Sequence, residues 1–191
     1  MSKRSGKLLK RKRVIVFAFE GKNNKTESLY FSHFCAFDDE WIIHCFSSGV
    51  TDPKGMLLAT KKKRKKLDYN PKEDLTFIFM DGDCDKKKKA LINDIRKSLP
   101  KDIRIVVSCP CFEIWFLNHF VFTGKEYRNN DELLKELDKH LKGYDKNIDY
   151  YSTLCPNTDA AIINSTKQKA NSSPSNTEVV DLFSESIIKH Q

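Results

Sequence analysis

Phe77-Ile78-Phe79-Met80-Asp81-Gly82-Asp83-Cys84-Asp85 is an apolar run that ends in three alternating aspartates. A continuous apolar run of this kind is typical of a strand buried on both faces, as in parallel sheets. Open α/β sheets bind ligands at the carboxyl ends of such strands, where closely spaced carboxylates repel one another unless a cation lies between them. Mg²⁺ prefers oxygen ligands of this type. The stretch therefore predicts a strand with a metal site at its end, and a solvated acidic loop is the alternative.

Strand-like and helix-like segments alternate in the first two thirds of the chain. Apolar runs predict strands at residues 14–19, 41–46, 75–80 and 103–107. Helices are expected between them, with Thr26 and Asp52-Pro53 as start signals and an apolar face on the segment after Lys86. This alternation predicts an α/β fold with about four parallel strands sandwiched by helices. A flavodoxin-like order, 2-1-3-4, would place the first and third strands side by side.

The composition changes after Phe122, where the strand-like runs stop. Residues 131–141 form an amphipathic pattern, a short helix is expected from Thr158, and Ser175-x-x-Glu178 resembles a capping box that would open a last helix. We therefore divide the chain into three parts. These are a basic disordered arm (1–13), an α/β domain (14–122) and a helical extension packed on the same domain (123–191).

Acidic residues stand beyond two other expected strands. Glu20 follows the first strand, and Glu113 falls in the first turn of an apolar, buried helix after the fourth. In the 2-1-3-4 order these residues converge with the aspartates of the third strand, which favours a divalent cation at that edge. Stabilisation of a helix dipole is the alternative explanation for Glu113 and for Glu27. His119 is expected to be a core or boundary histidine.

Positive charge is concentrated in two segments. The chain has 34 Lys and Arg against 26 Asp and Glu, a net charge of +8. Basic residues dominate the first thirteen positions, and a continuous basic run follows at Lys61, Lys62, Lys63, Arg64, Lys65 and Lys66. Six like charges repel unless an anion lies nearby, so this run predicts contact with nucleic-acid phosphates. A solvated helix face is the alternative.

The six cysteines are irregularly spaced, and no apolar stretch is long enough to span a bilayer. The sequence also shows no secretory leader. We therefore expect a cytoplasmic protein with free thiols and no membrane contact.

Several motifs together resemble the RloB family of bacterial Toprim-like proteins, over most of the chain from Val14 onward. They are Glu20-Gly21, Lys25-Thr26-Glu27, Tyr30-Phe31, Asp52-Pro53, Asp81-x-Asp83, Cys109-Pro110-Cys111-Phe112-Glu113-Ile114-Trp115-Phe116-Leu117 and Ser172-Ser173-Pro174-Ser175-Asn176-Thr177. The resemblance implies a Toprim fold in which Glu20, Asp81 and Asp83 surround Mg²⁺ during phosphodiester chemistry. It also implies association with restriction-modification and anti-phage defence. One departure from the family pattern is a longer loop between Gly21 and Lys25.

The leading hypothesis is a Mg²⁺- or Mn²⁺-dependent nuclease that cleaves RNA or DNA as a bacterial anti-phage defence effector. The expected metal-site residues are Glu20, Asp81, Asp83 and, as a helper, Asp85. The expected catalytic residues are Glu20, Asp81, Asp83, Glu113 and Lys25, with Glu20 or Glu113 as general base and Lys25 stabilising phosphoryl charge. One alternative is a non-catalytic module that binds nucleic acid or a partner protein within a larger defence complex. Another is phosphoryl transfer on a nucleotide.

Overall fold

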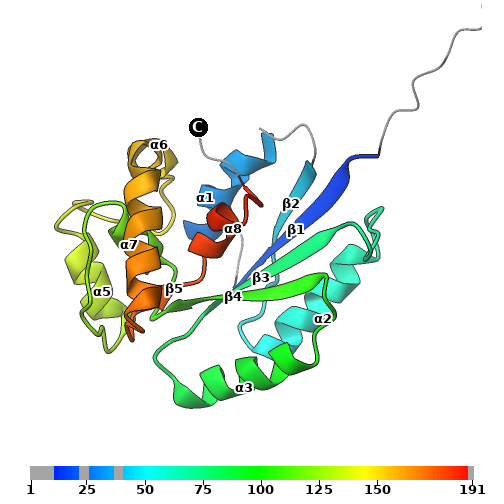
Figure 1. Ribbon diagram of the computed structural model, residues 1–191, viewed down its shortest axis with the longest axis horizontal. Helices are drawn as coiled ribbons and strands as arrows, with labels where there is room; N and C mark the ends of the chain where they lie inside the picture. The colour runs from blue at the N-terminus through cyan, green and yellow to red at the C-terminus, as the bar shows by residue number, and fades with distance from the viewer. Residues whose placement is uncertain (1–10, 22–25, 37–40, 189–191) are drawn as a thin grey trace, which may run out of the picture.

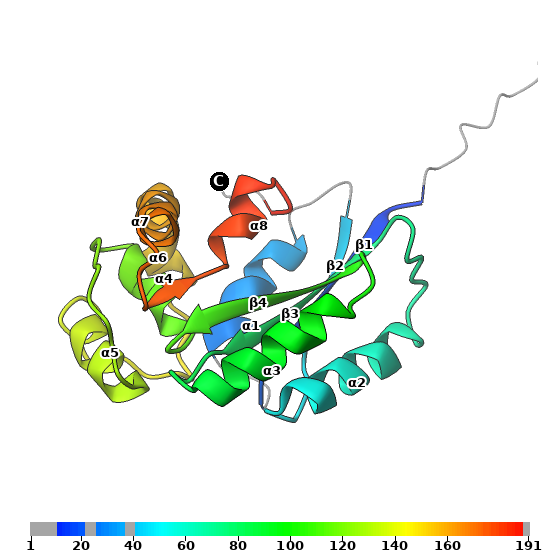
Figure 2. The same cartoon turned by 60° about the horizontal axis from the view of Figure 1, so that its bottom comes forward.

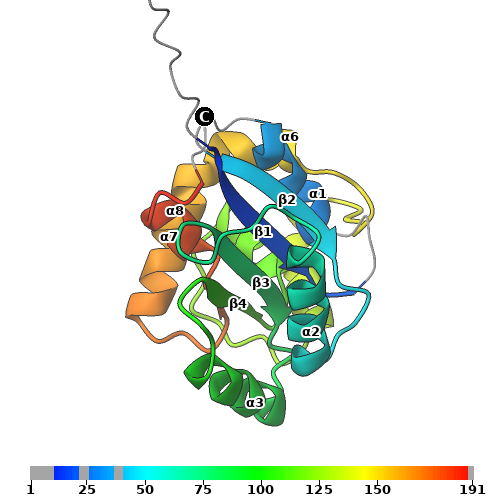
Figure 3. The ribbon, with the colours of Figure 1, turned by 90° about the vertical axis from the view of Figure 1, so that its right-hand side faces the viewer.

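A mixed five-stranded sheet forms the centre of the protein (Figure 1). The computed structural model describes residues 11–21, 26–36 and 41–188. The strand order is β2-β1-β3-β4-β5, which can be followed from β2 to β4 in Figure 3. The strands are β1 (Arg13–Phe19), β2 (Trp41–Ser47), β3 (Leu75–Asp81), β4 (Ile103–Cys109) and β5 (Asn176–Thr177). The predicted α/β class and the 2-1-3-4 order are confirmed, and the short antiparallel β5 is an addition.

Strands β1, β3 and β4 are largely buried because their apolar runs meet helices on both faces, whereas the edge strand β2 is half-buried. In β1, residues 14–19 are all buried, and the strand pairs on both sides: Ile15 lies opposite Ile43 of β2 and Leu75 of β3. A strand covered on two faces reads as a continuous hydrophobic run and not as an alternating one. This is the pattern from which the strands were predicted.

Two helices cover one face of the sheet. They are α2 (Pro53–Arg64) and α3 (Lys86–Lys97), seen together below the sheet in Figure 2. Met56 of α2 and Ile92 of α3 pack with Ala18 and Ile78 in a small core. Asp52 caps α2 as predicted, because its Oδ1 accepts the Gly55 N–H at 2.8 Å and Pro53 follows it at the first helical position. The capping fixes where α2 begins, close to the carboxyl edge of the sheet.

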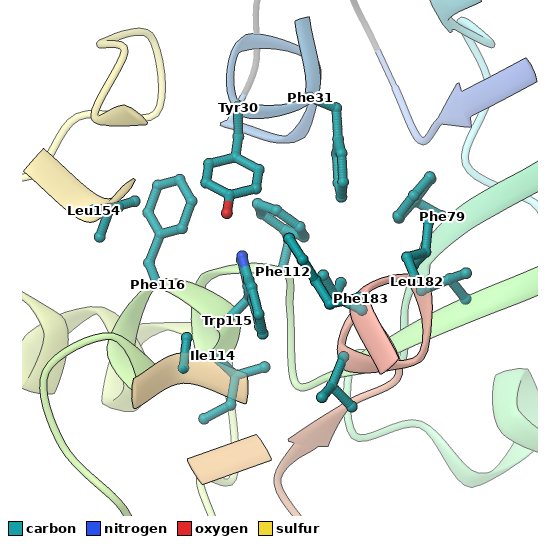
Figure 4. Close-up of a cluster of buried hydrophobic side chains, with 14 of the residues drawn as sticks. Tyr30, Phe31, Phe79, Phe112, Ile114, Trp115, Phe116, Leu154, Leu182 and Phe183 are labelled. Atoms are coloured by element: carbon teal, nitrogen blue, oxygen red, sulfur yellow. The ribbon is translucent and has the colours of Figure 1, made fainter. Parts of the chain in front are cut away.

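The remaining helices surround a larger, aromatic core, which covers the opposite face of the sheet. They are α1 (Thr26–Ser32), η1 (His33–Ala36), α4 (Glu113–Asn118), α5 (Asn130–Leu137), α6 (Tyr151–Leu154), η2 (Cys155–Asn157), α7 (Thr158–Ala170) and α8 (Val180–Ser184). Figure 4 shows Tyr30 and Phe31 of α1 facing Phe112, Trp115 and Phe116, which lie at the start of α4 and within it. The all-round apolar α4 is buried at every position, as predicted.

The end of the chain differs from the prediction at Ser175-x-x-Glu178. This segment opens no helix: residues 176–177 form β5, and α8 begins only at Val180. The Ser175 hydroxyl accepts the Tyr127 N–H at 2.9 Å, and the Glu178 carboxylate accepts the Val107 N–H at 2.8 Å. The two side chains that would have capped a helix therefore bind distant backbone, because pairing with β4 holds this segment extended.

The predicted basic arm ends earlier than residue 13. Arg13 is the first residue of β1, and Arg11 forms an ion pair of 2.7 Å with the buried Asp74. A buried carboxylate requires such a partner, which explains why Arg11 belongs to the folded protein. Residues 1–10 lie outside the described residues, and the three-part division of the chain stays a prediction. None of the helices in the described part of the chain has the length and apolar character needed to cross a membrane.

Candidate active site at the carboxyl edge of the sheet

The ends of β1 and β3 bring Glu20 and Asp81 into direct contact. Parallel pairing aligns Ala18 with Ile78, so the residues that follow emerge at the same edge. The Glu20 Oε2 atom accepts the Asp81 N–H at 3.1 Å. The convergence expected from the strand order is therefore present, while the catalytic and metal-binding roles of these residues stay predictions.

A lysine lies between the two acidic strand ends. Lys88 Nζ is 3.1 Å from Glu20 Oε1 and 2.6 Å from Asp83 Oδ2. Burial raises the pKa of Glu20, although the nearby Lys88 charge opposes the shift. In the structure Lys88 neutralises the carboxylates.

The turn after β3 directs Asp83 away from the sheet. Gly82 N–H donates to Ser108 at 2.7 Å and Asp83 N–H to Pro110 at 2.9 Å, so the turn is fixed against the end of β4. Asp83 and Cys84 have φ values of +47° and +52°, in the left-handed region that non-glycine residues rarely adopt. Each such residue costs on the order of 1 kcal/mol, and strain of this kind clusters at functional sites.

Glu113 is a buried carboxylate with three partners. Its Oε1 accepts from Thr26 Oγ1 at 3.1 Å and Tyr144 OH at 2.9 Å, and it lies 3.2 Å from Lys146 Nζ. Burial opposes ionisation, but the Lys146 charge and the hydrogen bonds outweigh it and lower the pKa of Glu113. Sequence reasoning missed Tyr144 and Lys146, which lie in an irregular segment without periodic signal. Glu113 is thus ionised through residues of the extension.

Asp81 connects the Glu20 and Glu113 sides of the site. Its Oδ1 accepts the Phe112 N–H at 2.9 Å, immediately before Glu113. Burial, reinforced by the charges of Glu27 and Glu113, holds the pKa of Asp81 well above its usual range. Burial and the Glu113 charge likewise raise the pKa of Glu27 to about 7. Negative charge is therefore crowded at this edge, which favours a cation.

The acidic side chains are not arranged as a ready metal cage. Among the described residues, no group of three or more His, Cys, Asp or Glu side chains is placed to hold a metal ion. Asp85, a predicted helper, caps α3 by accepting the Lys87 N–H at 2.7 Å. Lys25, the predicted phosphoryl-binding residue, lies outside the described residues.

A cavity of about 420 Å³ opens beside Lys88. Its lining comes from the end of β1, the start of α2, the turn after β3 and the first turns of α3: Glu20, Thr51, Asp52, Pro53, Asp83, Asp85, Lys87, Lys88 and Leu91. Cavities of this size accommodate small ligands. Glu20 and Asp83 line it together, and the two helix-capping carboxylates, Asp52 and Asp85, line it as well.

His119 belongs to the core, as expected. Its ring is 2% exposed, its Nδ1 lies 2.9 Å from the Trp115 carbonyl oxygen, and burial lowers its pKa to about 4. A neutral histidine buried among aromatic rings has a packing role.

The fold and site together define an α/β protein with acidic residues gathered at the switch point of a mostly parallel sheet. The family model described as RloB-like protein matches residues 15–186. The chain therefore belongs to the RloB-like family. Comparisons with curated proteins and with solved structures found no match.

Proposed function

We propose that this protein is a Mg²⁺- or Mn²⁺-dependent nuclease with a Toprim-like site, which hydrolyses RNA or DNA in bacterial anti-phage defence. One observation carries the proposal. Glu20 and Asp83 follow different strands, contact a single cation, Lys88, and line the same cavity. A position where two carboxylates already share a positive charge is chemically suited to a divalent ion.

The donor set fits a hard cation. Glu20, Asp81 and Asp83 would hold it, with Asp85 alongside, and all offer the carboxylate oxygens that Mg²⁺ and Mn²⁺ prefer. When bound, the ion supplies positive charge opposite the phosphoryl oxygens and makes water a better nucleophile. The raised pKa of Asp81 supports this fit, because a cation would relieve the repulsion that contributes to the shift.

Glu20 either completes the metal coordination or acts as the general base, and for the second role it is a better candidate than Glu113. A base works best when its pKa is close to the working pH. Burial raises the pKa of Glu20, whereas Lys146 outweighs burial and lowers that of Glu113. Glu20 also lines the cavity beside Lys88, so it can reach a water molecule there. We assign Glu113 the role of orienting Thr26 and Tyr144 through its hydrogen bonds.

Lys88 and the basic run would bind the nucleic acid. With Glu20 and Asp83 engaged in holding a metal ion, the Lys88 ammonium would be available to contact a phosphoryl oxygen and stabilise the charge that develops there. Lys25 would act in the same way. The run from Lys61 to Lys66 would add sequence-independent, salt-sensitive affinity for a substrate in the cytoplasm.

The alternative is a non-catalytic module that binds nucleic acid or a partner protein. The Lys88 contacts favour this alternative, because they neutralise Glu20 and Asp83 without any metal ion. In this case the acidic edge would be a structural feature of the family fold.

Cleavage assays separate the two functions. tRNA, single-stranded RNA and plasmid DNA are incubated with Mg²⁺, Mn²⁺ or EDTA and the native protein, Asp81→Asn/Asp83→Asn, or a control pair, Asp94→Asn/Asp131→Asn. The control removes the same charge from exposed positions. We expect metal-dependent cleavage that falls about 100-fold or more in the first pair alone. Intact substrates, with equal salt-sensitive binding by all three proteins, would instead support the module.

A further inference from the structure

A second cavity of about 430 Å³ lies at the opposite edge of the sheet, where the strands begin. Its walls come from the last turn of α2, the segment before β3 and the segment leading into β4. The first turn of α2 borders the acidic cavity, and its last turn borders this one. A helix of 12 residues is about 18 Å long, so the two cavities are separate sites.

The inner wall is apolar and rigidly held. Tyr69, Pro71, Pro100 and Ile103 provide ring and aliphatic surface. The Arg64 guanidinium lies 3.9 Å from the centre of the Tyr69 ring and forms an ion pair with the mostly buried Asp102. Tyr69 OH donates to the same carboxylate at 3.0 Å. These contacts fix the ring and neutralise the one carboxylate of the cavity lining.

Uncompensated positive charge lies at the rim. Lys61 and Lys65 line the cavity, are exposed and stand four residues apart, on one side of α2. Neither forms an ion pair within the described residues. With the charge of Asp102 already matched by Arg64, the cavity combines flat apolar walls with two ammonium groups at its mouth. Such pockets suit a ligand that carries a planar ring and an anionic group.

We propose that this cavity binds a phosphorylated nucleoside, with the base against the Tyr69 and proline walls and the phosphate at Lys61 and Lys65. Aromatic surface binds bases of any identity, and lysine binds phosphate as a point charge. The ligand is either a free nucleotide or the phosphorylated end of a nucleic acid. The proposal goes beyond the nuclease site and does not depend on it, because no residue is shared between the two cavities.

The test is binding of radiolabelled AMP, and of a 12-nucleotide single strand with or without a 5′-phosphate, in EDTA. Lys61→Glu/Lys65→Glu is compared with Lys142→Glu/Lys167→Glu, which changes the charge equally at exposed positions that neither line the cavity nor belong to the basic run. We expect affinity to fall about tenfold or more in the first pair and less than about twofold in the second.

A substitution that fills the cavity distinguishes binding inside it from general electrostatic attraction to the basic run. Pro71→Trp adds bulk at an exposed lining position and leaves the charge unchanged, and melting curves report whether each variant is folded. We expect the folded variant to lose binding. Binding of AMP identifies a free nucleotide, and binding of the 5′-phosphorylated strand alone identifies a chain end. The proposal would be overturned if the two lysine pairs weakened binding equally, or if folded Pro71→Trp bound as well as the native protein. It would also be overturned if neither AMP nor the 5′-phosphorylated strand bound more tightly than the strand without a phosphate.

Discussion

Lys88 is the residue on which the acidic edge depends in the absence of a metal ion. It contacts Glu20 and Asp83 through a side chain that is only 13% exposed, and the Glu20 side chain is 14% exposed. Partly buried pairs of this kind are costly to break, because the remaining charge loses both its partner and its access to water.

We predict that Lys88→Met lowers the free energy of unfolding by about 1–2 kcal/mol in EDTA, measured by urea denaturation at pH 8. Lys87→Met is the control, since Lys87 is exposed and lies in the same turn. If the edge accepts Mg²⁺, adding the ion should raise the melting temperature of Lys88→Met more than that of the native protein. Equal destabilisation by both substitutions would show that the loss of stability comes from changes in α3 and not from the Lys88 contacts with Glu20 and Asp83.

His119 gives a pH prediction with a definite sign. Burial lowers its pKa from 6.5 to about 4, so between these values the unfolded chain binds a proton that the folded protein does not. Stability should therefore fall as the pH falls from about 6.5 to 4, by up to about 3 kcal/mol from this residue. In His119→Phe this part of the slope should disappear in urea titrations across the range. An unchanged slope would assign the acid sensitivity to other groups.

A buried polar network joins α4 to α7. Asn118 Nδ2 donates to Ser165 Oγ at 2.7 Å and to Gln168 Oε1 at 2.8 Å, and Gln168 Nε2 donates back to Asn118 Oδ1 at 3.0 Å. All three side chains are fully buried. Because α4 carries Glu113, this network also helps to fix the position of the site.

We predict that Asn118→Leu destabilises the protein by about 2–4 kcal/mol, because the amide of Gln168 and the hydroxyl of Ser165 lose their buried partners. Chemical denaturation measures the loss. Thr166→Val provides the control on α7: Thr166 is exposed and its hydroxyl bonds only to the preceding turn, so its replacement should cost less than about 0.5 kcal/mol. A cost for Asn118→Leu as small as that of the control would show that the network contributes little.

At the scale of the whole molecule, residues after 122 are part of the main core. Side chains from this region complete the aromatic cluster in Figure 4, among them Leu154, Leu182 and Phe183. Each fully buried aliphatic or aromatic side chain contributes about 1.5–3 kcal/mol. The free energy lost on removing several of them is as large as the whole free energy of unfolding of a typical domain, about 5–15 kcal/mol.

We therefore predict that a chain ending at residue 122 fails to fold, as judged by circular dichroism and by the absence of a cooperative melting transition. Co-expression with residues 123–191 should restore a folded complex, because the missing side chains can still fill the core. A cooperative transition in the fragment alone would show that the α/β part is an independent domain.

Local patterns in the sequence were sufficient for the four parallel strands, their order, the Asp52 cap and the meeting of Glu20 with Asp81. The strands and the cap are signalled within a few neighbouring residues, and the strand order, which brings Glu20 to Asp81, follows from the topology usual for open α/β sheets. Only the tertiary structure decided three other features. Lys146 and Tyr144 contact Glu113, the segment from Ser175 to Glu178 contains a strand where a helix start was expected, and a cavity forms at Tyr69. They join residues that lie far apart in the chain, and such pairings leave no periodic pattern in a single sequence.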